Sequence, residues 1–218
     1  MQNDTDKPIN YFKYQRRDVY PYIPSDVTCV LDVGCAEGAF GSLLKTERGA
    51  TVWGVEINRE AASIAAGKID EVLIGDIVDV YNDLPKSHFD CIIFNDILEH
   101  LVDPWSILKS LSSCLTKNGY IVASIPNIRY YKVIDDLVFR KIFEYQPYGV
   151  LDETHLRFFT ESTIKSLITS CGFSIEILRG LRWERMSIFY TIINRLTFRY
   201  IEDMRYQQYV CVAKRNDG

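Results

Sequence analysis

The stretch Leu31-Asp32-Val33-Gly34-Cys35-Ala36-Glu37-Gly38 joins an apolar strand to a helix through a turn of small residues. The strand is predicted over residues 28–33, and its apolar character favours a place in a parallel sheet covered on both faces. Small side chains let a ligand approach the backbone of such a turn, and the next helix offers free N–H groups to an anionic group. The stretch predicts a ligand-binding turn, although two glycines after a strand also occur in ordinary tight turns.

Short apolar strands alternate with helical segments on either side of this turn. Helices are predicted through Leu43 and Leu44, near residues 59–68, from Pro104, and over residues 161–170. The further strands are predicted at residues 51–56, 71–74, 90–95, 120–125, 174–178 and 209–213. Such alternation indicates an α/β fold in which crossover helices join parallel strands.

Composition limits the class of protein. The 218 residues are 47% hydrophobic, which suits one globular domain with a sizeable core. Lys and Arg total 25 against 29 for Asp and Glu, a net charge of −4, so no general basic field exists to bind nucleic acid. The six cysteines form no C-x-x-C pair. Together with the absence of an export signal or an apolar run of membrane-spanning length, this predicts a cytoplasmic protein with reduced thiols and no transmembrane segment.

Three acids end three successive predicted strands: Asp32, Glu56 and Asp76. A carboxylate at Asp32 would repel the pyrophosphate of a dinucleotide, but it suits a ligand with sulfonium and ammonium groups, such as S-adenosylmethionine. Glu56 could accept hydrogen bonds from ribose hydroxyls, and Asp76 with the N–H of Ile77 could bind adenine. Each acid alone is equally compatible with a solvated or helix-capping role; the three together favour the methyl donor.

At this point the sequence resembles the class I S-adenosylmethionine-dependent methyltransferases over roughly residues 11–173. The motifs that carry the resemblance are 31–38, Gly54-Val55-Glu56-Ile57, Gly75-Asp76 and the segment 95–104, which reads NDILEHLVDP. The resemblance implies a Rossmann-like seven-stranded sheet with helices on both faces and an antiparallel last strand. The donor-binding residues that it implies are Asp32, Gly34, Gly38, Glu56, Ile57, Asp76, Ile77 and Asn95. Ala36 stands where the family often has glycine, so we expect a slightly altered loop.

Two later segments resemble a narrower branch of the family. Residues 124–131, SIPNIRYY, and 151–160, LDETHLRFFT, are similar to methyltransferases associated with bacterial glycosyltransferase and surface-polysaccharide genes. This resemblance implies O-methylation of a sugar or glycan precursor in polysaccharide biosynthesis. The alternatives are a ubiquinone-type O-methyltransferase acting on a small aromatic acceptor, a non-catalytic S-adenosylmethionine-binding protein, and an NAD-dependent oxidoreductase. The charge of Asp32 and the lack of an obvious hydride-site pair count against the oxidoreductase.

Two histidines are the candidate catalytic bases. A sugar hydroxyl is a poor nucleophile, and His100 and His155 follow strands at the predicted ligand edge. For each, a structural histidine bonded to backbone is an equal alternative. The segment Asp96-Ile97-Leu98-Glu99-His100 is similar to an acid-x-x-Glu-His segment of the ubiquinone-biosynthesis O-methyltransferases, where a divalent ion is implied. Helix capping accounts for the acids here as well, and the site is predicted to work without metal.

The chain is predicted to be one methyltransferase domain over residues 1–218. Residues 1–27 would form an N-terminal helical cap, residues 127–160 a lid over the acceptor site, and residues 183–206 a helical insertion between the last two strands. The insertion carries an apolar stripe with arginines. It could cover the sheet, form a homodimer contact or lie on a membrane surface.

Overall fold

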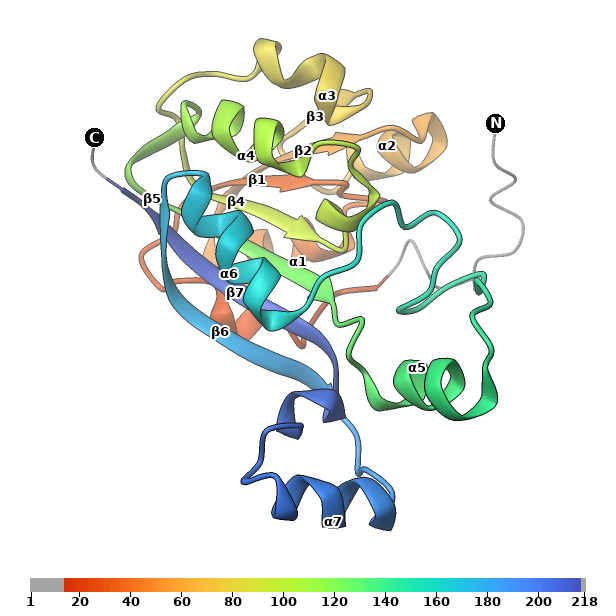
Figure 1. Ribbon diagram of the computed structural model, residues 1–218. Coiled ribbons are helices and arrows are strands. Elements are labelled where there is room, and N and C mark those ends of the chain that lie inside the picture. Colours follow the sequence, from red (N-terminus) through yellow and green to blue (C-terminus); the bar gives the residue numbers. More distant parts are fainter. Residues whose placement is uncertain (1–13, 217–218) are drawn as a thin grey trace.

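One mixed sheet of seven strands organises the protein, whose computed structural model describes residues 14–216 (Figure 1). The strand order is β3-β2-β1-β4-β5-β7-β6, and only β7 runs antiparallel to its neighbours. The strands are β1 (Cys29–Val33), β2 (Thr51–Glu56), β3 (Glu71–Ile74), β4 (Phe89–Asn95), β5 (Leu115–Pro126), β6 (Phe173–Trp183) and β7 (Tyr206–Arg215). The predicted α/β fold, with its seven strands and antiparallel last strand, is confirmed.

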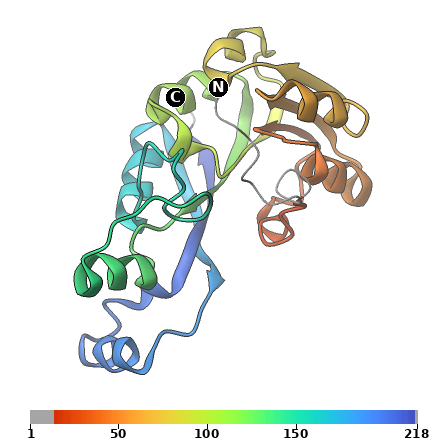
Figure 2. The ribbon, with the colours of Figure 1, turned by 90° about the vertical axis from the view of Figure 1, so that its right-hand side faces the viewer.

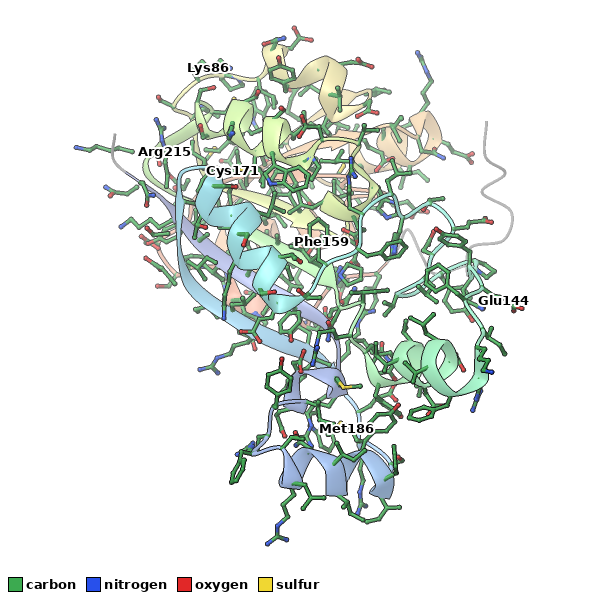
Figure 3. The ribbon with its side chains drawn as sticks, in the orientation of Figure 1. Lys86, Glu144, Phe159, Cys171, Met186 and Arg215 are labelled. Atoms are coloured by element: carbon green, nitrogen blue, oxygen red, sulfur yellow. The ribbon has the colours of Figure 1, made fainter. Side chains whose placement is uncertain are left out.

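Alternating strand residues divide the core into two layers. On one face, Leu31 and Ile92 pack with α3, α4 and α6; on the other, Val30 and Ile93 pack with α1, α2 and the N-terminal segment. The helices are α1 (Ala39–Arg48), α2 (Arg59–Ala65), α3 (Ile77–Val80), α4 (Pro104–Ser112) and α6 (Glu161–Ser170), with the short turns η4 (Tyr81–Asp83) and η5 (Leu98–His100) between them. Figure 3 labels Phe159 where α6 begins to cover its face.

Several elements are longer or shorter than their sequence patterns predict. β6 and β7 pair from Phe173 with Arg215 to Trp183 with Tyr206, well beyond the predicted residues 174–178 and 209–213. Antiparallel pairing extends through charged residues because one side of this two-strand edge faces solvent. α2 ends at Ala65, three residues before the predicted position, where the chain turns through Gly67.

Helix starts follow the expected chemistry. Pro104 occupies the first turn of α4, and the side chain of Asp103 accepts a hydrogen bond from the N–H of Ser106. Thr160 and Thr163 form a reciprocal capping box at the start of α6.

The segment that follows β5 leaves the sheet and returns to its edge. It forms α5 (Tyr131–Asp135), which continues into one π-helical turn, η6 (Asp136–Arg140), and then runs without regular structure to α6. A bridge between Asn127 and Phe159 joins its two ends. Residues 127–160, predicted to form a lid over the acceptor site, thus contain a short helix and a long loop.

Residues 184–205, between β6 and β7, form an appendage made of α7 (Ile188–Leu196) and the 3₁₀ turn η7 (Glu202–Arg205). Figures 1 and 2 both place α7 beside α5, away from the sheet. Met186, labelled in Figure 3, packs with Tyr190 and Met204 against Tyr131 and Ile134. The appendage therefore does not cover a sheet face, which was one of the three interpretations left open.

The described part of the predicted N-terminal cap, residues 14–27, contains one 3₁₀ turn, η3 (Tyr20–Tyr22). Residues 1–13 of that cap lie outside the described residues. Val19 and Ile23 are buried on the α1 face, and the guanidinium of Arg48 donates hydrogen bonds to the carbonyl groups of Tyr20 and Ile23. Within residues 14–216, no helix combines the length and apolar character needed to cross a bilayer.

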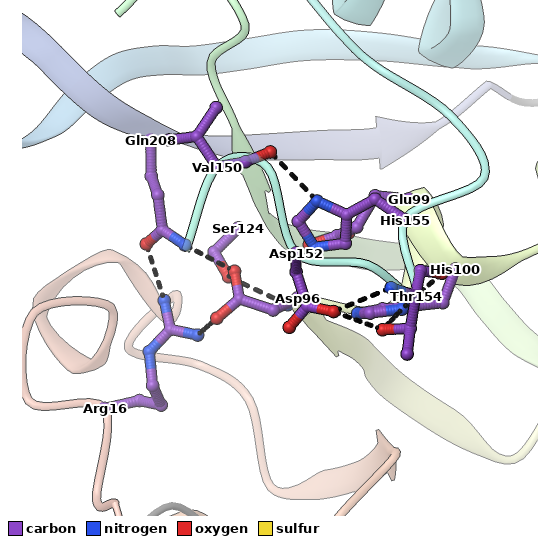
Figure 4. Close-up of polar contacts among 10 residues, drawn as sticks. All are labelled: Arg16, Asp96, Glu99, His100, Ser124, Val150, Asp152, Thr154, His155 and Gln208. Carbon is purple, nitrogen blue, oxygen red and sulfur yellow. Dashed lines mark hydrogen bonds and ion pairs between the residues drawn. The ribbon is translucent and has the colours of Figure 1, made fainter. Parts of the chain in front are cut away.

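A buried arginine fixes this segment to the carboxyl edge of the sheet (Figure 4). Arg16 is 5% exposed and donates hydrogen bonds to Asp96 after β4 and to Gln208 of β7. Gln208 in turn donates to the second oxygen of Asp96 at 2.6 Å. Three segments that lie 80 and 112 residues apart along the chain thus meet at one carboxylate.

Arg16→Met should lower the free energy of unfolding by about 1–3 kcal/mol, because the buried guanidinium and its hydrogen bonds are lost and Asp96, whose side chain is 27% exposed, loses its cation. Adding Asp96→Asn should restore part of that loss, since the uncompensated charge is then gone. Urea unfolding of wild type, both single variants and the double variant measures the coupling. Arg17→Met, at an exposed position next in sequence, is the matched control and should change stability by less than about 0.5 kcal/mol. If the losses in unfolding free energy of the two single variants simply add up in the double variant, Arg16 and Asp96 are not coupled.

Candidate active site

The turn between β1 and α1 adopts left-handed backbone conformations at Gly34, Ala36 and Gly38, with φ of +71°, +50° and +72°. A Cβ on Gly34 would lie 2.1 Å from Cδ1 of Ile97, and one on Gly38 would lie 3.1 Å from Cα of Ala65. The positive φ favours glycine at both positions, and at Gly38 the backbone of Ala65 leaves little room for a side chain. Ala36, at the position where the resemblance implies glycine, also takes a left-handed conformation, which glycine adopts more readily than alanine.

Asp32 lies near the end of β1 and is 2% exposed. Burial, followed by the negative charge of Glu56, raises the pKa of its carboxyl to about 7, and Arg16 opposes this shift. Its side chain has no hydrogen-bond partner within residues 14–216. A buried acid left in this state suits a cationic ligand, which would favour the ionised form.

Glu56, at the end of β2, holds the turn in place. One carboxylate oxygen accepts the N–H of Ala36 and the other accepts the N–H of Asn58, both at 2.8 Å. Each oxygen can accept a second hydrogen bond, so the geometry is compatible with ribose hydroxyls. Ile57, which follows directly, is exposed beside it.

Asp76 caps α3, since its carboxylate accepts the N–H of Val78 at 3.0 Å. The helix-capping role left open for this acid is thus what the structure shows, and its second oxygen accepts no hydrogen bond from the described residues. Ile77 is buried at the first position of the helix.

Asn95 ends β4 with a buried side-chain oxygen that has no hydrogen-bond partner among the described residues. Such an oxygen costs about 1–3 kcal/mol unless a donor group reaches it. With Asp32, this makes two polar groups at the carboxyl edge that lack protein partners in the described chain. The residues fit a ligand that brings hydrogen-bond donors and positive charge, as the ammonium and sulfonium of S-adenosylmethionine do.

The two candidate histidines lie together, with ring centroids 4.7 Å apart. His155 is buried, and its Nδ1 lies 3.0 Å from the carbonyl oxygen of Val150. A carbonyl can only accept, so Nδ1 of His155 carries a proton. Its Nε2 lies 3.9 Å from a carboxylate oxygen of Glu99.

His100 is oriented by a chain of hydrogen bonds (Figure 4). Its Nδ1 lies 3.2 Å from the carbonyl oxygen and 3.0 Å from the hydroxyl oxygen of Thr154. The Thr154 hydroxyl donates to the buried Asp152 at 2.6 Å, which leaves its oxygen to accept from His100. Nδ1 is therefore the protonated nitrogen, and Nε2 of His100 is the one that can take up a proton.

Glu99, 1% exposed, lies beside both rings. Burial, then the charge of Asp96, raises the pKa of Glu99 well above its usual range. Neither of its side-chain oxygens has a hydrogen-bond partner among the described residues. Glu99, His100 and His155 each offer a ligand atom, all within 4.8 Å of one another, so they could hold a divalent ion.

This trio differs from the set Asp96, Glu99 and His100 that the resemblance implied. Asp96 is turned toward Arg16 and Gln208, and His155 takes its place beside Glu99. Sequence reasoning also missed Asp152 and Thr154 as supports of His100. They lie in the 151–160 segment already noted, but only the fold shows that they meet a residue 54 positions earlier.

Comparison with known proteins identifies the family of the chain. Residues 10–177 match the family described as "Methyltransferase domain". The chain is 23% identical over 182 residues to the ubiquinone biosynthesis O-methyltransferase of Vibrio cholerae serotype O1, covering 81% of this chain and 73% of that protein. It is also 23% identical over 180 residues to the protein of the same name from Vibrio vulnificus, covering 79% and 74%.

Solved structures share the fold. An S-adenosylmethionine-dependent methyltransferase from Archaeoglobus fulgidus superposes with a TM-score of 0.64 at 25% identity, covering 90% of this chain and 91% of that one. The 1,6-didemethyltoxoflavin-N1-methyltransferase of Burkholderia thailandensis, solved with S-adenosylhomocysteine, gives 0.61 at 15% identity, covering 93% and 78%. The chain thus belongs to the methyltransferase domain family and is an S-adenosylmethionine-dependent methyltransferase.

Proposed function

We propose that this enzyme methylates a hydroxyl group of a sugar or glycan precursor in polysaccharide biosynthesis, with His100 as the base. The observation that carries the proposal is the chain from Asp152 through Thr154 to His100, which fixes the base form of the imidazole at Nε2. The resemblance of residues 124–131 and 151–160 to the polysaccharide-associated branch supports the choice of acceptor.

The donor would be held at the carboxyl ends of β1, β2 and β4. Asp32 would supply a carboxylate and Asn95 an amide oxygen. Glu56 would accept hydrogen bonds from the ribose hydroxyls. The left-handed turn from Gly34 to Gly38 would leave room for the methionine part of the ligand. Ile57, Ile77 and the second oxygen of Asp76 complete the adenine side. S-adenosylmethionine supplies a methyl group on a positively charged sulfur. The neutral thioether that remains after transfer is a good leaving group.

Deprotonation of the acceptor is what this chain's own residues must provide. A sugar hydroxyl attacks well only as its proton leaves, and Nε2 of His100 can take that proton while Thr154 holds Nδ1–H. His155 is more deeply buried and faces Glu99, so we assign it a positioning role beside the base. The unsatisfied oxygens of Glu99 could accept further hydroxyl groups of the acceptor.

A small aromatic acceptor is the second candidate, favoured by the 23% identity to the Vibrio ubiquinone-biosynthesis enzymes. In this alternative, Glu99, His100 and His155 would hold a divalent ion, which would supply positive charge to lower the pKa of the acceptor hydroxyl. The two candidates differ in acceptor and in metal dependence.

His100→Ala should lower methyl transfer by about 100-fold or more, because the hydroxyl loses its proton acceptor. S-adenosylmethionine affinity, measured by calorimetry, should change by less than about threefold, since His100 is not one of the residues proposed to bind S-adenosylmethionine. Transfer of labelled methyl to a panel of nucleotide sugars, with a catechol for comparison, measures the rate. His88→Ala, at an exposed histidine outside the site, is the control. Full turnover by His100→Ala would remove His100 as the base.

Activity toward the sugar acceptor should survive exhaustive treatment with a chelator. Loss of activity that Mg²⁺ or Zn²⁺ restores, together with its abolition in Glu99→Gln, would instead assign the ion-binding role to Glu99, His100 and His155.

Asp32→Asn should stabilise the ligand-free enzyme near pH 8 by on the order of 1–3 kcal/mol. The folded-state pKa of about 7 exceeds the unfolded value, so folded Asp32 holds a proton that the unfolded chain has released between about pH 4 and pH 7. Stability from this group is therefore lost as pH rises through that window. Urea unfolding of both proteins at several pH values tests this, with Asp26→Asn as the exposed control.

The same substitution should weaken donor binding. Wild-type affinity for S-adenosylmethionine should fall by up to about tenfold per unit as pH drops below about 7, with proton release on binding. Asp32→Asn should bind weakly with a flatter profile. Equal affinity of both proteins across this range would remove Asp32 from the donor site.

A further inference from the structure

Helix α7 has its apolar face toward solvent. Tyr190 and Asn194 are the buried residues of the helix, whereas Ile188, Ile192 and Leu196, one turn apart, form an exposed stripe. Ile188 is 76% and Leu196 73% exposed. A helix that serves only the protein core has the opposite orientation, with its polar face outward.

The exposed stripe of α7 continues onto a second segment. In η6, Leu137, Val138 and Phe139 are exposed, and the ring of Phe139 lies 5.8 Å from that of Phe189 on α7. Figures 1 and 2 show the two segments side by side at the end of the molecule farthest from β3. Phe198, just after α7, is 95% exposed. We call Leu137, Val138, Phe139, Ile188, Ile192 and Leu196 the apolar tip.

The charges around the apolar tip are unbalanced toward positive. Most of the neighbouring acids form ion pairs: Asp135 and Asp136 with Arg140, Glu184 with Lys132, and Glu202 with Arg205. The exposed Glu144 is the exception, since it has no ion pair within residues 14–216. The basic residues Lys141, Arg185 and Arg195 are exposed and have no acidic partner within residues 14–216. Three unpaired basic residues therefore stand against one unpaired acid, a local positive excess in a chain whose net charge is −4.

We propose that the apolar tip docks onto an anionic lipid bilayer. Apolar side chains would enter the interface, and the three basic groups would meet lipid phosphates. A second copy of this chain fits less well, because a two-fold contact would place the same apolar face and the same basic groups opposite each other. The proposal does not depend on the identity of the acceptor.

Vesicle sedimentation of the full-length enzyme tests the proposal. Binding should be strong to phosphatidylcholine vesicles that contain about 30% phosphatidylglycerol and weak to phosphatidylcholine alone. Ile192→Ser with Leu196→Ser should reduce binding by about tenfold or more. Arg185→Gln with Arg195→Gln should reduce it by about fivefold for each charge removed. Ile64→Ser and Lys109→Gln, exposed on α2 and α4, are the matched controls and should bind as wild type does.

Calorimetry with S-adenosylmethionine should give wild-type affinity for all these variants, which shows that they are folded and separates this test from that of the proposed function. Absence of binding to the phosphatidylglycerol vesicles would overturn the proposal. Equal binding by the apolar-tip variants would also overturn it, because another surface would then be responsible. Sedimentation velocity without lipid provides the remaining test: a dimer that Ile192→Ser with Leu196→Ser dissociates would make a second copy the occupant.

Discussion

The burial of acids with few cations to balance them is the constraint on which this site depends. Among the described residues, Asp32, Glu56, Glu99 and Asp152 are buried, and Arg16 is the one buried lysine or arginine. Taking a carboxylate out of water is costly unless hydrogen bonds or opposite charges compensate for it. Glu56 and Asp152 receive backbone N–H groups, so their burial is compensated within the protein. Asp32 and Glu99 have no comparable hydrogen bonds, and both have raised pKa values.

Polar groups whose burial is not compensated within the protein are the ones that can gain most from binding a ligand. Asp32 and the orphaned oxygen of Asn95 lie at the ends of β1 and β4, whereas Glu99 lies with the two histidines just beyond β4. In the proposed function, the first group would form the donor side, which attracts positive charge, and the second the acceptor side, which takes up a proton. Perturbed acids gathered at the edge of a parallel sheet are typical of functional sites. The stability lost in the free enzyme becomes available as binding energy.

The sequence alone predicts the strands and the glycine turn, because apolar runs and turn residues act locally. It also predicts that Asp32 and Glu56 lie at one edge, since parallel strands end together. It does not distinguish a capping Asp76 from a binding one, because both roles need the same residue at the same place. Nor does it show that Asp96 faces Arg16, or that His155 joins Glu99, because these contacts depend on the path of a long loop. Likewise, the periodicity of residues 188–196 predicts an apolar stripe on α7, but it does not predict whether that stripe faces the core or the solvent.

The position of β7 has a consequence for synthesis. Although it is the last strand in the chain, it lies between β5 and β6 and supplies Gln208 to the Arg16 and Asp96 cluster. While the ribosome still holds residues 206–215, β5 has one unpaired edge and β6 has no strand neighbour at all. In the nascent chain, the place between β5 and β6 therefore stays empty until β7 has been synthesised. Aggregation during translation is the hazard that this order of assembly creates, and chaperone binding to the open edges would reduce it.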